Sequence, residues 1–239
     1  MYQFAINNKN IVKNKHWSPI KDVSDCLVKY CKNNNYSNVL EIGPGLTPFP
    51  LSNKFIGFNE NVDSYISVDI DDEKLPFYNK EIDFIYSRHT LEDIQNPNFA
   101  MKEIIRCCKS GYIETPSPII EMTKGVDGGN SDLYCGYIHH RYIIWSDIKK
   151  CEIYFLPKYS SILDNYVNLI KPIEYYNLIN NNPLYWNNYF IWKDKEPKII
   201  NYKNGINFHL NVDNYIKLLN ESLNTYMENT DYFYSNYMK

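Results

Sequence analysis

The chain has 239 residues and a net charge of −3, a length that suits one α/β domain with elaborations and a charge that gives no basic footprint for a nucleic-acid backbone. No apolar run approaches the length of a transmembrane helix and the N-terminus lacks the core of a signal peptide, so we expect a cytoplasmic protein without membrane contact. The six cysteines form no C-x-x-C pair, which predicts reduced thiols and neither a zinc site nor a disulfide framework.

The first predicted helix follows a polar N-terminal stretch. Ser18 can cap a helix, and Pro19 suits the first helical position. Apolar residues then recur at helical spacing, which predicts one face packed on a sheet, and the run Asn33–Asn35 ends the helix before the first strand.

Residues 39–50 predict a buried strand that ends in a tight turn. The apolar strand contains Glu41, and Gly43 and Gly45 follow it. Glycine lets the backbone approach a ligand closely, at the edge where open α/β sheets bind cofactors. A dinucleotide site wants a third glycine and an immediate helix, whereas residues 47–50 contain no glycine and two prolines, which disfavours that alternative.

This stretch resembles motif I of the class I S-adenosylmethionine-dependent methyltransferases, through Glu41, Gly43 and Gly45. In that family the acidic residue helps hold the loop and the amino-acid end of the cofactor, and the glycines admit the methionine portion. The resemblance implies S-adenosyl-L-methionine as the cofactor. The residues that it places at the cofactor here are Glu41, Gly43, Pro44 and Gly45.

Residues 65–70 predict the next strand, after residues 49–58, where we expect a short helix. Asp69 lies near the carboxyl end of that strand. In the methyltransferase family an acidic residue there accepts hydrogen bonds from both ribose hydroxyls, because a carboxylate offers two acceptor oxygens to a vicinal diol. We therefore assign Asp69 and its neighbour Ile70 to cofactor binding.

The family normally has a third strand, with its own acidic residue near the adenine, before the motif that begins at Leu75. Only residues 70–74 separate Asp69 from Leu75. Either that edge strand is absent, so that seven strands become six, or Asp69 belongs to it and Asp63 is the ribose acid. We favour the first interpretation, because Asp69 follows an apolar strand.

Residues 75–93 resemble the segment L-P-F-x-x-x-x-F-D-x-h-x-S-x-H-x-L-E-H of a large methyltransferase branch that includes many small-molecule enzymes. Ile82 replaces the usual Phe, and Asp93 replaces the second His. The resemblance implies that Asp83 opens the fourth strand. The residues that it places over the cofactor are Ser87, Arg88 and His89.

Asn96-Pro97 predicts the start of another helix, and residues 111–118 predict strand five entering a rigid loop. The segment G-Y-I-E-T-P-S-P resembles a sub-branch of these enzymes that is often encoded beside glycosyltransferases. That sub-branch later carries an H-R-W/Y element, which His140-Arg141-Tyr142 match. The resemblance spans residues 36–160 and implies acceptor-binding roles for Glu114, Arg141 and Tyr142. Arg141 either binds a phosphate of a nucleotide-sugar or pairs with an acidic neighbour such as Glu114.

The C-terminal third is less informative. Residues 151–156 and 198–202 predict antiparallel strands that finish the sheet. The aromatic cluster at residues 185–192 favours a buried hairpin or lid packing over an aromatic wall for a sugar ring. Residues 212–223 predict a terminal helix, and we expect the tyrosine-rich tail after it to be mobile.

The predicted fold is therefore α/β, a doubly wound and mainly parallel sheet of the Rossmann-like, class I methyltransferase type, finished by a C-terminal antiparallel hairpin. We expect a single domain over residues 1–239. It divides into an N-terminal helical extension (1–35), a cofactor-binding core (36–160) and a part with strands, an aromatic lid and the terminal helix (161–239).

The acceptor is predicted by elimination and by resemblance. Enzymes that methylate amino groups of bases or amides carry an [NDS]-P-P-[YFW] loop where this chain has Ser87–Thr90, and cytosine-5 enzymes need a Pro-Cys nucleophile that this chain lacks. The glycan-associated sub-branch indicates O-methylation of a sugar hydroxyl in a glycan or nucleotide-sugar. The alternatives are another small-molecule hydroxyl or carboxylate, or a non-catalytic binding subunit with this fold.

An alcohol is a poor nucleophile at neutral pH, so transfer to a hydroxyl benefits from a general base such as an imidazole. We predict His140 as this base, with His139 second, and place His89 at the cofactor. The competing interpretation is a histidine that only braces the loop. No metal ligand and no protein partner are predicted.

Overall fold

The structure is a computed structural model. It describes residues 19–57, 65–124, 126–127, 134–160, 162–163, 174, 177–178, 181–202 and 211–239. Within these ranges no helix is long and apolar enough to cross a membrane.

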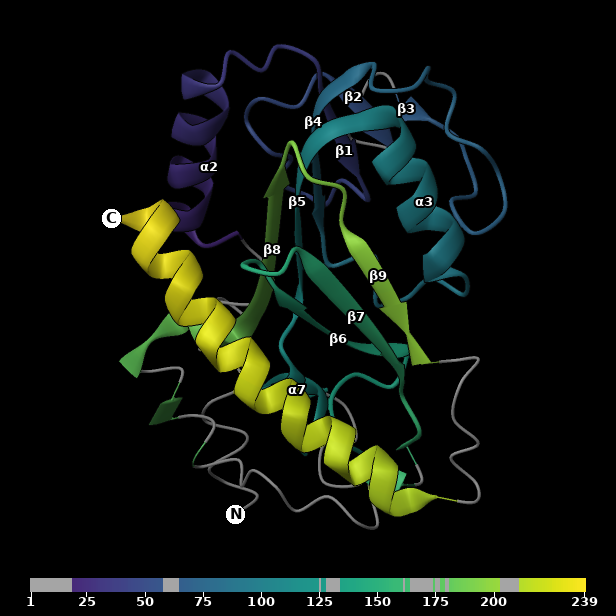
Figure 1. The fold of residues 1–239 in the computed structure, drawn as a ribbon, viewed down its shortest axis with the longest axis vertical. Helices are drawn as coiled ribbons and strands as arrows, with labels where there is room; N and C mark the ends of the chain where they lie inside the picture. The colour runs from purple at the N-terminus through teal and green to yellow at the C-terminus, as the bar shows by residue number, and fades with distance from the viewer. Residues whose placement is uncertain are drawn as a thin grey trace.

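The centre of the molecule is a six-stranded sheet with the order β3-β2-β1-β4-β5-β8 (Figure 1). All neighbours pair in parallel except β5 and β8, which are antiparallel. The predicted doubly wound, mainly parallel sheet is therefore confirmed. Its strands are β1 (Val39–Ile42), β2 (Lys54–Ile56), β3 (Tyr65–Ile66), β4 (Ile82–Arg88), β5 (Cys108–Pro116) and β8 (Asn187–Lys193).

Helices lie on both sides of this sheet, α2 (Lys21–Asn33) on one side and α3 (Pro97–Cys107) on the other (Figure 1). The helix α2 begins two residues after Pro19, and Ile20 occupies its N-cap without a side-chain hydrogen bond. For α3 the predicted start is confirmed, because the Asn96 side chain accepts a hydrogen bond from the backbone N–H of Phe99 and Pro97 opens the helix. Since helices cover both faces, the central strands are buried almost throughout.

The prediction for the edge of the sheet was wrong. Residues 54–56, inside the expected short helix, form β2, which pairs with β1. Residues 65–66 form the edge strand β3, so the third strand is present and Asp69 follows it. Of the two interpretations left open, the structure supports the one in which Asp69 belongs to the edge strand. Asp63 lies outside the described residues.

The C-terminal strands also differ from the prediction. The antiparallel strand that finishes the main sheet is β8, which is the aromatic cluster itself. The strands β7 (Glu152–Pro157) and β9 (Lys198–Asn201) pair in parallel with each other. With β6 (Tyr142–Asp147) they form a separate three-stranded sheet, in which β6 and β7 are the antiparallel hairpin.

The aromatic side chains of β8 belong to the core. Tyr189 and Phe190 are fully buried, and the ring of Tyr189 stacks on that of Phe233 with 4.7 Å between centroids. These rings are therefore not an exposed wall for a sugar.

The terminal helix α7 (Val212–Phe233) is ten residues longer than predicted and continues into a π-helical turn η4 (Tyr234–Met238). It runs diagonally across the molecule and ends beside α2 (Figure 1). The prediction of a mobile tail after residue 223 is wrong, because Tyr226 and Phe233 belong to this helix and are fully buried.

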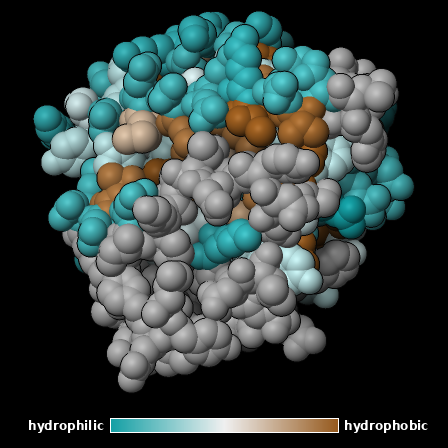
Figure 2. Space-filling view, turned by 90° about the horizontal axis from the view of Figure 1, so that it is seen from below, coloured by the Kyte–Doolittle hydropathy of each residue, from teal (hydrophilic) through white to brown (hydrophobic). Residues whose placement is uncertain are grey.

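Buried apolar side chains form two clusters. The larger one lies around the main sheet, and the smaller one joins the short helix α4 (Pro118–Glu121), β6 and α7. Figure 2 views the end of the molecule at which α7 begins, and apolar surface of the described residues shows there as a band among hydrophilic atoms. The short 3-10 helix η1 (Pro183–Trp186) leads into β8 and buries Trp186 in the smaller cluster.

Candidate functional site

The predicted site residues gather at the carboxyl edge of the main sheet. The ends of β1, β4 and β5 lie side by side there, with Ile42 paired to Ser87 and Ser87 paired to Ile113. The glycine turn continues β1, and residues 88–93 continue β4. This is the edge at which open α/β sheets bind their ligands.

Glu41 organises the glycine turn from inside the protein. Its side chain is 2% exposed, and Oε2 accepts a hydrogen bond of 2.9 Å from the backbone N–H of Phe49. Burial raises the pKa of Glu41 against the lowering effect of that bond. The carboxylate therefore ties the strand to the far end of the loop.

Gly43 and Gly45 differ in what surrounds them in the turn. Gly43 has φ +68°, and a Cβ there would come within 2.0 Å of Thr90 Oγ1, so the turn after β4 is what packs against it. A Cβ on Gly45 would meet nothing within 4 Å. Gly45 is exposed, while Pro44 between the two glycines is buried. The open side of the turn is thus at Gly45.

Two observations fit a bound S-adenosylmethionine at this edge. A Cβ built on Gly45 would meet no atom of the described residues within 4 Å, and Ser87 Oγ is a buried polar atom that has no hydrogen-bond partner within the same part of the chain. A buried hydroxyl without a partner is costly, and a polar ligand would satisfy it. Gly45 and Ser87 come from neighbouring strand ends, as a shared ligand requires.

Asp69 is exposed beyond the edge strand and held in a turn of its own. Its Oδ1 accepts a hydrogen bond from the N–H of Asp71, and its backbone N–H donates to Glu73 Oε2. Ile70 is half-buried against the core. Asp69 thus follows the edge strand β3 and not β2.

The segment Leu75–Phe77 is pinned by α3. Glu103 Oε2 accepts a hydrogen bond from the N–H of Leu75, and Arg106 donates to the carbonyls of Leu75 and Phe77. The same two side chains form an ion pair at 2.7 Å. The hydrogen bond from Arg106 outweighs burial and lowers the pKa of Glu103.

A buried polar network joins β4, β5 and β8 below the turn. Glu114 is 2% exposed, and its Oε1 accepts hydrogen bonds from Arg88 Nε at 2.8 Å and Asn187 Nδ2 at 2.7 Å. Tyr112 donates its hydroxyl to Oε2 of the same carboxylate. Because Arg88 takes this role, the predicted alternative of an Arg141–Glu114 pair is wrong.

His89 is locked between this network and a second carboxyl group. Its Nε2 lies 3.1 Å from Asn187 Oδ1, and its Nδ1 lies 3.5 Å from Glu92 Oε1. Since the Asn187 amide donates to Glu114, its oxygen faces His89 and favours the tautomer with the proton on Nε2. The backbone of His89 has φ +50°, an uncommon conformation for a non-glycine residue that clusters at functional sites.

Glu92 is buried without the partners that a carboxylate normally has. It is 1% exposed, and neither oxygen has a hydrogen-bond partner within the described ranges. Burial raises the pKa of Glu92 to about 8, against the lowering effect of His140. Burial therefore favours the neutral form of Glu92.

His140 belongs to a buried triad. Its Nδ1 lies 2.6 Å from Glu121 Oε1, and Lys158 Nζ lies 2.6 Å from the other oxygen of Glu121. Burial works against both charges, but Lys158 and His140 lower the pKa of Glu121 to about 2. For His140 burial is likewise outweighed, and Glu121 raises its pKa above 6.5.

The remaining predicted residues lie around this triad. His139 is exposed, with Nε2 4.0 Å from Asp93 Oδ1, and Arg141 is exposed while its backbone N–H donates to the carbonyl of Glu92. Tyr142 is buried and donates its hydroxyl to the carbonyl of Gln95. The structure thus brings the histidines of residues 139–140 beside the turn after β4, but Tyr142 points away from them into a structural bond.

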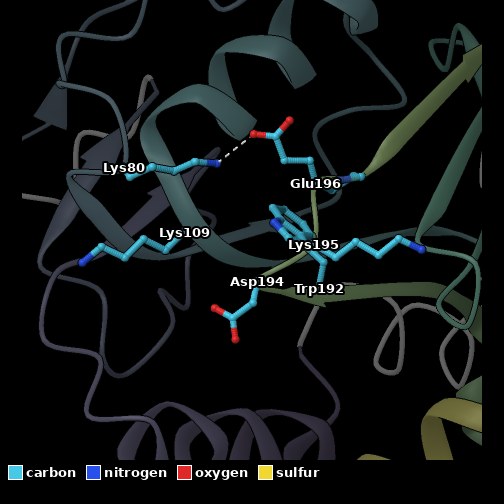
Figure 3. Close-up of a pocket in the computed structure, with 7 residues that line it drawn as sticks. Lys80, Lys109, Trp192, Asp194, Lys195 and Glu196 are labelled. Carbon is cyan, nitrogen blue, oxygen red and sulfur yellow. Dashed lines mark ion pairs between the residues drawn. The ribbon is translucent and has the colours of Figure 1, made fainter.

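A hollow of the surface lies at the opposite edge of the main sheet. It is lined by Lys80, Lys109, Trp192, Asp194, Lys195, Glu196 and Pro197, where β4 and β5 begin (Figure 3). Its lysines already have partners, since Lys80 pairs with Glu196 at 3.5 Å and Lys109 with Asp83 at 2.7 Å. This hollow is not the cofactor edge.

The comparison with protein families agrees with the geometry of the carboxyl edge. Residues 40–113 match the family described as Methyltransferase domain, a range that contains the glycine turn, Asp69 and the segment 75–93. The chain carries a methyltransferase domain. Its cofactor is S-adenosylmethionine, as predicted.

Several solved structures resemble parts of the chain. A S-adenosylmethionine-dependent methyltransferase from Mesorhizobium loti shares 16% identity, with 36% of this chain and 50% of that chain covered and a TM-score of 0.31. One from Clostridium acetobutylicum shares 13% identity, with 50% and 59% covered and a TM-score of 0.38. A complex of the Haloferax volcanii Trm112 methyltransferase activator with a putative methyltransferase shares 17% identity with this chain. The match covers 48% of this chain and 58% of that chain, with a TM-score of 0.30.

These similarities are too low to carry an argument, and the chain spans about half to three fifths of the length of these three structures. No curated protein matches the chain. The strand order of the methyltransferase domain therefore rests on the structure itself.

Several residues of the methyltransferase domain and its surroundings were missed at the sequence level. They are Thr90, Glu92, Asp93, Glu121, Lys158 and Asn187. Glu92 and Asp93 lay within a motif, and their acidic character next to His89 was the available signal. Glu121, Lys158 and Asn187 had no signal, because their partners lie 19 to 73 residues away in the chain.

Proposed function

We propose that the protein transfers the methyl group of S-adenosylmethionine to a hydroxyl group of a sugar, in a glycan or a nucleotide-sugar. The observation that carries the proposal is the convergence of the glycine turn, the buried Glu114 network and the His139–His140 segment at one edge of the sheet. The methyltransferase family match supports the reaction class. The resemblance of residues 111–118 and 140–142 to glycan-associated enzymes supports the acceptor class.

The cofactor lies, in this proposal, along the ends of β1 and β4. Gly45 admits the methionine portion, and Ser87 Oγ offers a hydrogen bond that no described residue satisfies. Asp69, which follows β3, serves the adenine side of the nucleoside, in place of the ribose role expected from the sequence. Glu41 does not contact the cofactor in this proposal. Its carboxylate accepts a hydrogen bond from the backbone N–H of Phe49 and so holds the loop in place.

The acceptor lies beside the turn after β4, on the side of residues 139–141. Asp93, His139 and Arg141 are all exposed there, which suits a hydrophilic acceptor with several hydroxyl groups. His140 is the residue we assign to activation of the acceptor hydroxyl, because Glu121 fixes the ring through Nδ1 and leaves only Nε2 for this task. His139 takes second place, since no carboxylate orients it at hydrogen-bond distance.

Two measurements test the proposal in sequence. Calorimetry should show binding of S-adenosylmethionine and S-adenosylhomocysteine but not of NAD. Transfer of a labelled methyl group is then assayed over a panel of sugars, nucleotide-sugars, phenols and carboxylic acids, with product mass as the readout.

Turnover on a sugar hydroxyl is the expected outcome, and His140→Gln should lower it at least about a hundredfold, the scale of general acid–base assistance, while cofactor affinity is unchanged. Absence of cofactor binding contradicts the whole proposal. Turnover confined to phenols or acids contradicts the acceptor class only, and cofactor binding without any turnover indicates a binding subunit.

A further inference from the structure

Beside the proposed acceptor position, three side chains that the methyl-transfer proposal treats one by one also form a set. One donor atom each of Asp93, His139 and His140 lies within 4.8 Å of those of the other two. Asp93 comes from the turn after β4, while the histidines come from the segment before β6, 46 and 47 residues later. Two imidazoles and one carboxylate are a donor set that first-row transition metals bind in many proteins.

We propose that Asp93, His139 and His140 bind a divalent transition-metal ion of the Zn²⁺ class at the acceptor side of the methyltransferase domain. The donor atoms of the three side chains, which lie within 4.8 Å of one another, need to move only slightly closer together to bind one ion. Ligands around a tetrahedral Zn²⁺ stand about 3.4 Å apart, given bonds of about 2.1 Å, and Asp93 Oδ1 and His139 Nε2 are already 4.0 Å apart.

The surroundings of His140 are those of a metal ligand. Glu121 lies 2.6 Å from Nδ1 and so directs Nε2 toward the ion, which displaces the proton from Nε2 when it binds. The other oxygen of Glu121 is held by Lys158 at 2.6 Å, and all three side chains are at most 5% exposed. The orientation of the ring is therefore fixed before any ion arrives.

The charge and exposure of the set also favour an open site. Glu121 and Lys158 compensate each other, which leaves the carboxylate of Asp93 as the negative charge that attracts the ion. The side chains of Asp93 and His139 are 44% and 64% exposed, so the remaining coordination positions face solvent. Three protein ligands with open positions are the arrangement of catalytic rather than structural zinc sites.

The site deepens the proposed function, and only this step rests on that function. An acceptor hydroxyl that binds the ion has its pKa lowered, so its proton passes to solvent water as the oxygen takes the methyl group from S-adenosylmethionine, which leaves as S-adenosylhomocysteine. This step revises the role of His140 given above: with Nε2 bound to the ion, His140 activates the hydroxyl as a ligand and not as the general base.

The test measures metal binding without any turnover. Chelator-treated protein is titrated with Zn²⁺ by calorimetry and with Co²⁺, whose visible absorption reports nitrogen and oxygen coordination. One equivalent should bind, and Asp93→Asn and His139→Gln should each weaken binding at least about tenfold, since loss of a ligand exceeds the loss of a second-shell contact. The control Asp72→Asn changes an exposed carboxylate outside the set and should leave binding unchanged.

Failure to bind either ion at one equivalent overturns the site, as does binding that both substitutions leave intact. Both substituted side chains are exposed, and circular dichroism verifies that the variants keep the parental fold. Binding of S-adenosylmethionine is measured on the same samples. If the parent protein binds S-adenosylmethionine but neither metal ion, only the metal site is refuted. If it binds a metal ion but not S-adenosylmethionine, only the methyl-transfer proposal is refuted.

Discussion

The two edges of the main sheet carry similar residue types in different surroundings. At the carboxyl edge the buried Glu114 and Asn187 and the largely buried Arg88 share hydrogen bonds across three strands. At the amino edge Lys80 and Glu196 are exposed and form a pair at 3.5 Å (Figure 3). Burial makes the first set expensive to assemble and expensive to break, whereas solvent screens the second. The difference predicts that the buried charges of the carboxyl edge are far more costly to disturb than the exposed charges of the amino edge.

The sharpest test of this contrast removes one carboxylate from each edge. Glu114→Ala removes a 2% exposed carboxylate that accepts hydrogen bonds from Arg88, Asn187 and Tyr112, and breaking such a buried charged network costs about 3–5 kcal/mol in the free energy of unfolding. Glu196→Ala removes an exposed partner and should change that free energy by about 0–1 kcal/mol. Urea denaturation of both variants checks the prediction, and equal losses would show that the Glu114 network contributes no more than a surface pair.

A second test separates the two glycines of the cofactor turn. Gly43→Ala places a Cβ at φ +68° and within 2.0 Å of Thr90 Oγ1, so it should cost at least about 1–3 kcal/mol of stability. For Gly45→Ala the new Cβ meets no atom of the described residues within 4 Å, so stability should change by at most about 0.5 kcal/mol. Thermal denaturation measures the first effect. Calorimetry with S-adenosylmethionine asks whether Gly45→Ala weakens binding, as expected if the cofactor lies on its open side.

A third test concerns the acid that follows the edge strand. Asp69→Ala should weaken S-adenosylmethionine binding roughly ten- to hundredfold, because a charge-assisted hydrogen bond contributes about 1.5–3 kcal/mol. Asp72→Ala, three residues later and exposed, is the matched control. If both variants bind with parental affinity, Asp69 has no contact with the cofactor and the nucleoside is held elsewhere.

The smallest effect is expected at the Glu103–Arg106 ion pair, whose exposure lies between that of the Glu114 network and that of the Lys80–Glu196 pair. Glu103 has its pKa lowered chiefly by the hydrogen bond from Arg106, so the folded state binds a proton less readily than the unfolded state. Its contribution to stability is present above about pH 4.5 and is lost as the pH falls through the lower folded pKa. In Glu103→Gln this part of the acid-induced loss should disappear, at a cost of about 1–2 kcal/mol at neutral pH. Urea denaturation of the parent and the variant between pH 3 and 7 checks this prediction. If the free energy of unfolding depends on pH in the same way in both, Glu103 does not contribute to the acid-induced loss of stability.

The sequence predicted those features that depend on contiguous residues. The β1–turn segment, the start of α3 at Asn96-Pro97 and the strand expected within residues 111–118, which the structure has as β5, follow from local hydrophobicity, capping and glycine chemistry. The methyltransferase class and its cofactor follow from motifs of the same local kind, within residues 40–113. Such patterns act over a few residues, and so they can be read without knowing what packs against them.

Pairing partners and buried contacts were decided only by the tertiary structure. Residues 54–56 read as a poor helix because two prolines precede them, yet an open place beside β1 makes them a strand. For the aromatic residues of β8 the sequence left a buried hairpin and a lid open, and antiparallel pairing with β5 is what buries them in the core. The sets Arg88–Glu114–Asn187 and Glu121–His140–Lys158 join residues that lie up to 99 positions apart. A hydrogen bond between distant residues leaves no periodic trace in the chain, so these contacts exist only once the strands have been placed side by side.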